Sequence, residues 1–118
     1  MFEKMIEMSL LFDFYGQLLT QKQQDILKMY YEDNYTLVEI AEELGVSRQA
    51  IYDSIKKVER LLYSYEEKLG LTHKFAQTNQ AMDQINLLIE QALSETSADP
   101  RLNSELIQMK AIIEKLND

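Results

Sequence analysis

Cysteine is absent from the 118 residues of this chain, which excludes disulfide bonds, thiol catalysis and cysteine-ligated metals. Long apolar runs are absent too: no stretch approaches the roughly 20 residues that a membrane-spanning helix needs. Two early carboxylates, Glu3 and Glu7, argue against a signal peptide. We therefore expect a cytoplasmic protein with no membrane partner.

The usual signatures of catalysis are also missing. There is no glycine-rich phosphate loop and no cluster with the spacing of metal ligands. The acidic pairs Glu42-Glu43 and Glu66-Glu67 cannot converge on one ion, because adjacent helical residues point about 100° apart, and we expect them to be solvated. Catalysis by His73, the only histidine, is not expected. The sequence predicts no enzyme, no cofactor and no metal site.

What the chain does contain is a helix-turn-helix pattern over residues 36–60, TLVEIAEELGVSRQAIYDSIKKVER. Thr36 and Glu39 have the spacing of a capping box at the start of the first helix. Gly45 can take the left-handed conformation that ends a helix, and Ser47 can cap the second one. The apolar residues predicted to face inward are Val38, Ile40, Ala41, Leu44, Ile51, Ile55 and Val58, with Val46 in the corner.

Helical signals continue on both sides of this motif, and no alternating strand pattern is present. We expect a helix over 2–15 that is too apolar for burial on one side, a helix from Gln21 capped by Thr20 and ended by Asn34, and an extension of the recognition helix to Leu69 before Gly70. Beyond it, the spacing predicts a helix over 72–93, with Phe75, Met82, Ile85, Ile89 and Ala92 repeating along it, a polar linker over 94–98, and a last helix that starts at Asp99-Pro100.

The predicted fold is all-α: a helical bundle that contains the helix-turn-helix, followed by a C-terminal helical hairpin. We expect one domain over residues 1–69 and a second over residues 70–118. The apolar seam of the last helix is about two heptads long, too short to be stable alone. Together with the surplus apolar surface of residues 2–15, it predicts self-association into a homo-oligomer.

Residues 18–62 resemble the DNA-reading region 4 of bacterial sigma factors. Leu19, Thr20 and Gln23 match its first element, and residues 40–47 (IAEELGVS) match its helix-turn-helix. The chain is acidic and no promoter-melting domain precedes this unit, so we expect no working sigma factor.

Taken whole, including the opening MFEKMIEMSLLFDFYGQLLTQKQ, the chain resembles the YlxM family of small bacterial helix-turn-helix proteins. This resemblance implies a regulatory role in protein targeting, because members are encoded beside the protein component of the signal recognition particle. It adds that particle's RNA and its protein components to the expected partners.

The candidate nucleic-acid-binding residues lie on the polar side of the second motif helix: Ser47, Arg48, Gln49, Tyr52, Asp53, Lys56, Lys57 and Arg60. Arg and Gln side chains can read base edges, and the lysines can reach phosphates. The net charge of −8 points the other way, since duplex-binding domains are usually basic. Residues 47–60 are nevertheless a positive island, with Asp53 and Glu59 as their only acids.

Two alternatives stay open. The motif can serve protein contact, with the acidic surface meeting a basic partner such as the targeting GTPase. Five of the seven tyrosines could form a base-stacking platform, although their helical spacing favours packing against the core: Tyr30, Tyr31, Tyr35, Tyr63 and Tyr65.

Overall fold

The computed structural model describes residues 2–95 and 99–116, and every regular element within them is helical. The chain divides into two compact units, Met1–Thr72 and His73–Asp118. The elements are α1 (Phe2–Tyr15), the short 3-10 helix η1 (Gly16–Leu18), α2 (Gln21–Tyr31), α3 (Leu37–Leu44), α4 (Arg48–Leu69), α5 (Leu71–Glu95) and α6 (Pro100–Leu116). The all-α fold predicted from the sequence is confirmed.

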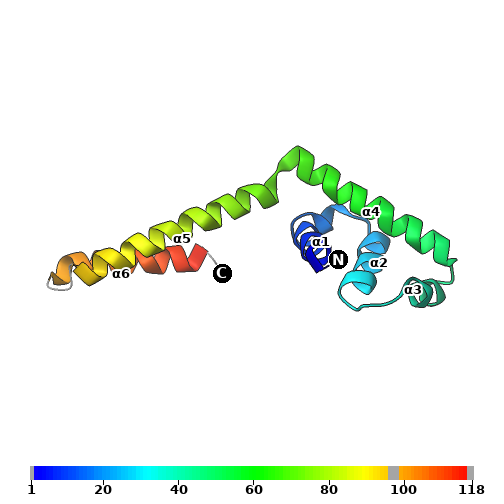
Figure 1. Cartoon of the computed structure of the whole chain (residues 1–118), viewed down its shortest axis with the longest axis horizontal. Helices are drawn as coiled ribbons and strands as arrows, with labels where there is room; N and C mark the ends of the chain where they lie inside the picture. Colours follow the sequence, from blue (N-terminus) through cyan, green and yellow to red (C-terminus); the bar gives the residue numbers. More distant parts are fainter. Residues whose placement is uncertain (1, 96–98, 117–118) are drawn as a thin grey trace. The chain divides into compact units, whose positions relative to one another are not determined.

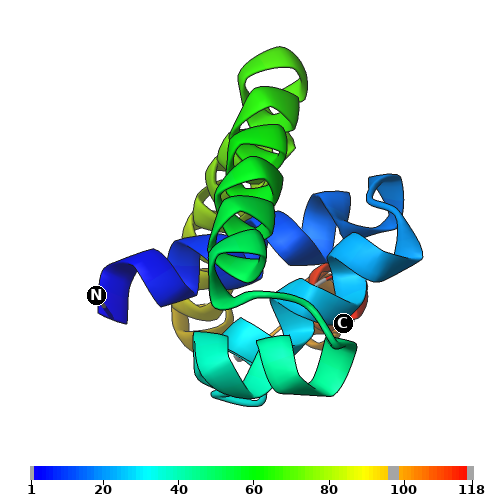
Figure 2. The same ribbon diagram turned by 90° about the vertical axis from the view of Figure 1, so that its right-hand side faces the viewer.

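In the N-terminal unit, α4 is the element on which α1, α2 and α3 all pack (Figure 1). Figure 2 shows α1 passing across α4, with α3 beside the beginning of α4. Two buried clusters result. The first joins α1 to α4 and contains Met8, Leu11, Tyr15, Leu19, Leu27, Val58 and Leu62. The second joins α2 and α3 to α4 and contains Ile26, Ile40, Ala41, Ile51 and Ile55.

The predicted helix starts of this unit are confirmed. Thr20 and Thr36 both form complete capping boxes, with Gln23 and Glu39 as their respective partners. The end of α2 was predicted wrongly, because the helix stops at Tyr31 rather than at Asn34. Asn34 instead turns the chain toward α3 with a φ of 58°, a left-handed conformation that asparagine tolerates.

The turn between α3 and α4 also follows the prediction. Gly45 has φ 68° and ψ 35°, and the Ser47 hydroxyl accepts a hydrogen bond from the Ala50 amide at 3.0 Å. Two predicted inward residues do not face inward: Val38 is 48% exposed and Val46 is 40% exposed. α3 has only eight residues, so its buried stripe is filled by Ile40 and Ala41, and Val38 lies outside it.

The predicted solvation of the Glu66 carboxylate is wrong. It accepts a hydrogen bond from the Tyr15 hydroxyl at 2.5 Å and another from the Thr72 amide at 3.1 Å. The Tyr15 oxygen in turn accepts a hydrogen bond from the Leu71 amide at 3.0 Å. The first amides of α5 have no partners within their own helix, and these two oxygens provide them.

In the C-terminal unit, α6 runs back along α5 as the predicted hairpin (Figure 1), and an ion pair of 3.1 Å joins Lys110 to Glu90. The Asp99 carboxylate caps α6 by accepting from the Arg101 amide at 3.1 Å, which confirms the predicted helix start. Ser94 and Glu95 belong to α5, not to a linker, and 96–98 lie outside the described residues.

Apolar burial in the C-terminal unit is slight. Ile89 is its one buried side chain among the described residues. Phe75 and Ile85 belong to the same predicted apolar repeat as Ile89, yet they are 47% and 46% exposed. A hairpin of two helices covers only one narrow stripe of each, so the regular spacing along α5 does not translate into burial within the chain.

Candidate nucleic-acid interface

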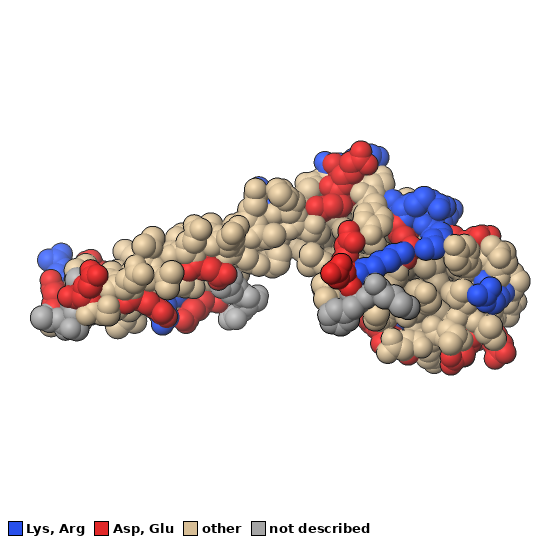
Figure 3. Space-filling view, in the orientation of Figure 1, with Lys and Arg blue, Asp and Glu red and all other residues tan. Residues whose placement is uncertain are grey.

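The predicted contact residues lie where the sequence analysis placed them, at the start of α4 and along its outer side. Ile51, Ile55 and Val58 anchor the inner side in the two clusters. The outer side exposes Ser47, Arg48, Gln49, Tyr52, Asp53, Lys57 and Arg60, whereas Lys56 is half-buried. Figure 3 shows the largest group of basic atoms on this face of the unit over α4, with other basic atoms apart from it and acidic atoms along the borders.

Neighbouring side chains on this surface interact with one another. The Gln49 amide donates to the Asp53 carboxylate at 3.0 Å, and the Lys56 ammonium lies 5.6 Å from the centre of the Tyr52 ring. Gln49 and Asp53 lie one helical turn apart, and their mutual hydrogen bond uses part of the hydrogen-bonding capacity of each side chain. Within the described residues, Arg48, Lys57 and Arg60 form no ion pair. They are the cations most available to an anionic ligand.

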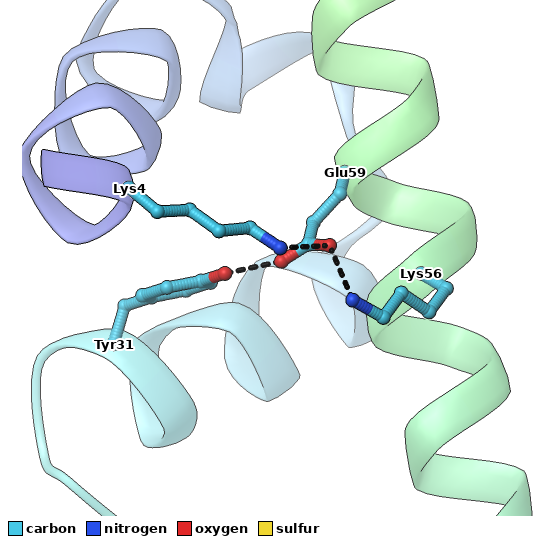
Figure 4. Close-up of polar contacts among 4 residues, drawn as sticks. All are labelled: Lys4, Tyr31, Lys56 and Glu59. Carbon is cyan, nitrogen blue, oxygen red and sulfur yellow. Dashed lines mark hydrogen bonds and ion pairs between the residues drawn. The ribbon is translucent and has the colours of Figure 1, made fainter. Parts of the chain in front are cut away.

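Glu59 does not lie on the solvated face. Its side chain is only 7% exposed, and three donors converge on its carboxylate (Figure 4). Lys4 from α1 lies at 3.3 Å, Lys56 at 3.4 Å, and the Tyr31 hydroxyl from α2 donates a short hydrogen bond. Glu59 therefore ties α1 and α2 to α4, and Lys56 is a paired cation rather than a free one.

This cluster shifts two pKa values. The negative charge of Glu59 raises the pKa of Lys56, so the ammonium stays charged throughout the neutral range. Burial raises the pKa of the Tyr31 phenol, and its hydrogen bond to Glu59 raises it further. Both effects favour the arrangement in which a single carboxylate faces three donors.

Sequence reasoning missed Lys4 and Tyr31 as members of this arrangement, and it only counted Glu59 among the acids of residues 47–60. A signal was nevertheless present for Glu59. It follows Ile55 by four residues and precedes Leu62 by three, so helical periodicity puts it on the buried side. No comparable signal identifies Lys4, because its partner lies 55 residues away.

The tyrosines divide between core and surface. Tyr31 and Tyr65 pack against the first cluster and Tyr30 against the second, as expected from their helical spacing. Tyr35 and Tyr63 remain 36% and 41% exposed.

Within residues 2–95 and 99–116, no three histidine, cysteine, aspartate or glutamate side chains gather as metal ligands would. None of the helices there combines the length and the apolar character needed to cross a membrane.

Comparison with known proteins places this arrangement in a family. Residues 2–100 match the family UPF0122, described as "Putative helix-turn-helix protein, YlxM / p13 like". A UPF0122 protein of Listeria innocua is 48% identical over 112 residues, which cover 95% of this chain and 99% of the relative. UPF0122 proteins of Bacillus cereus and Bacillus anthracis are each 45% identical over 117 residues, covering 99% of this chain and 100% of each relative.

Proposed function

The chain belongs to the UPF0122 (YlxM / p13-like) family of helix-turn-helix proteins, and from this premise we propose that it is a non-catalytic, nucleic-acid-binding regulatory protein. Its contact surface is the exposed side of residues 47–60. The observation that carries the proposal is that Arg48, Lys57 and Arg60, on the helix that follows the Gly45 turn, are exposed and form no ion pair with any residue that the structure describes. A helix presented in this way by a helix-turn-helix enters a nucleic-acid groove with its N-terminal half.

The net negative charge of the chain limits nucleic-acid binding to one surface. With a net charge of −8, the rest of the molecule repels phosphates, so binding away from α4 is weak. Affinity should fall as salt rises, because each neutralised phosphate releases a counterion.

We propose that the protein acts in the signal recognition particle pathway, and this part of the proposal rests on the family resemblance. The geometry favours duplex DNA, because the major groove of A-form RNA is too narrow for a helix. A role in this pathway instead favours the RNA of the signal recognition particle as the ligand. Titrations with the two nucleic acids in parallel distinguish transcriptional regulation from a role in protein targeting.

The experiment is a fluorescence-anisotropy titration with labelled signal-recognition-particle RNA and, in parallel, a mixed-sequence DNA duplex, at low and near-physiological salt. Arg48→Ala and Lys57→Ala should weaken binding and reduce the salt slope by about one unit each, if each contacts one phosphate. Lys115→Ala in α6 makes the same charge change elsewhere and should leave affinity unchanged.

Unchanged affinity in both α4 variants would overturn this assignment of the surface. Binding to neither nucleic acid would favour the protein-interaction alternative, for which the acidic surface is the supporting observation. In that case, capture of the signal recognition particle protein by the full chain should survive nuclease treatment.

We also propose that the protein self-associates. The supporting observation is unpartnered apolar surface: Ile6 on α1 is 55% exposed, Leu88 on α5 is 63% exposed, and Ile112 on α6 is 63% exposed. A two-fold assembly would present two copies of α4 to two half-sites. Light scattering should give more than the monomer mass of 13.9 kDa, and a monomer at tens of micromolar would contradict the proposal.

A further inference from the structure

An open cleft of about 590 Å³ lies in the N-terminal unit beside the start of α4. Its volume falls within the range of about 300–1,000 Å³ that small-molecule sites occupy. Four elements and the segment before α3 contribute to it. The lining residues that bear chemistry are Lys4, Tyr30, Tyr31, Tyr35 and Arg48.

Three of these residues are aromatic. Tyr30 and Tyr31 meet edge to face, with ring centres 5.0 Å apart and an interplanar angle of 84°. Tyr31 is fixed by its hydroxyl bond to the buried Glu59, and Tyr30 packs against the second core cluster. Tyr35 follows the left-handed turn at Asn34 and remains 36% exposed. The cleft therefore combines two fixed rings with a more accessible one.

The other two are cations. Lys4 approaches from α1, where its ion pair with Glu59 directs the ammonium while 45% of the side chain stays exposed. Arg48 is the first residue of α4 and is also exposed. The Lys4 ammonium is thus engaged by Glu59, and Arg48 is the cation available to a ligand. An aromatic surface beside an exposed cation is what proteins use to hold an unstacked base together with its phosphate.

We propose that this cleft accepts one unpaired nucleobase of a bound strand, stacked on Tyr35, with Arg48 facing the adjacent phosphate. The inference rests on the proposed nucleic-acid binding and specifies the ligand further. The exposed side of α4 contacts a paired segment, and the cleft reads a nucleotide that leaves the stack next to it. Such a site gives a helix-turn-helix a means of recognising RNA that does not require inserting α4 into the narrow groove.

The test uses the full chain and two hairpin RNAs with the same stem, one fully paired and one with a single-nucleotide bulge that carries 2-aminopurine. The wild-type protein should bind the bulged RNA more tightly and should quench the fluorescence of the 2-aminopurine. Tyr35→Leu removes the ring and should lower affinity for the bulged RNA about tenfold, within the range measured for base–aromatic stacking. Tyr35→Phe keeps the ring and is the matched control, so both affinity and quenching should be retained.

The outcomes separate the two proposals. If the paired hairpin binds through Lys57, which does not line the cleft, but the bulged base is neither preferred nor quenched, the cleft proposal is overturned and the interface on α4 stands. If neither RNA binds and a DNA duplex also fails, both are overturned. Quenching by the wild-type protein does not depend on how well Tyr35→Leu folds, and circular dichroism of each variant establishes that the helices are intact. Equal affinity of Tyr35→Leu and wild type for the bulged RNA also counts against the cleft.

Discussion

Replacing Glu59 by alanine tests how the N-terminal unit is held together. A double-mutant cycle that compares Glu59→Ala, Tyr31→Phe and the double variant isolates the energy of the hydrogen bond between the two side chains. A hydrogen bond to a charged group contributes about 1.5–3 kcal/mol, and Glu59 is only 5% exposed, so little solvent screens it. The two lysines are 45% and 38% exposed, so their ion pairs add at most about 1 kcal/mol each. We expect Glu59→Ala to lower the free energy of unfolding by about 2–4 kcal/mol.

The assay is urea unfolding of the full chain at neutral pH, followed by far-ultraviolet circular dichroism. Glu67→Ala is the matched control, because it removes an exposed carboxylate from the same helix and should change stability by less than about 0.5 kcal/mol. The reasoning is refuted if Glu59→Ala is as mild as Glu67→Ala. A coupling energy near zero between Glu59 and Tyr31 would refute the hydrogen-bond part of the account.

Two other perturbations address the turn and the pH dependence. Gly45→Ala should lower the free energy of unfolding by about 1–2 kcal/mol, measured by heat or urea, because φ is 68° there although an added Cβ would meet nothing within 4 Å. Gly45→Asn should lower it by less, because asparagine tolerates this backbone conformation. Equal losses in the two variants would contradict the argument from backbone strain. The raised pKa of Tyr31 stabilises the fold below the unfolded value of about 10, and this contribution is lost as pH rises through the folded value. Urea unfolding across the range above about pH 10 should therefore show a shallower loss of stability for Tyr31→Phe than for wild type, and parallel losses would exclude this linkage.

Local signals in the sequence account for most of the helix boundaries. Capping boxes at Thr20 and Thr36, the cap at Ser47 and the left-handed glycines at positions 45 and 70 act within a few residues, so they can be recognised without knowing the fold. The candidate contact residues of α4 could be predicted for the same reason. Helical periodicity separates their side from the one carrying Ile51, Ile55 and Val58.

What could not be predicted depends on contacts between distant segments. Lys4 joins the Glu59 carboxylate across 55 residues, and the cleft beside α4 forms only when residues from α1, α2 and α3 come together. Apolar spacing alone also overestimated burial. The same spacing is compatible with a core within the chain and with a surface that a partner covers. Phe75 and Ile85 fit the repeat that contains the buried Ile89, and they are nevertheless exposed.

The measurement that tests the central claim most directly is amide chemical-shift mapping of the isotopically labelled chain during titration with nucleic acid, first the DNA duplex and then the signal-recognition-particle RNA. The account predicts that shifts and line broadening concentrate on residues 47–60, on the exposed side of α4, and weaken as salt is raised. Changes confined to α5 and α6, with residues 47–60 unaffected by either ligand, would contradict it.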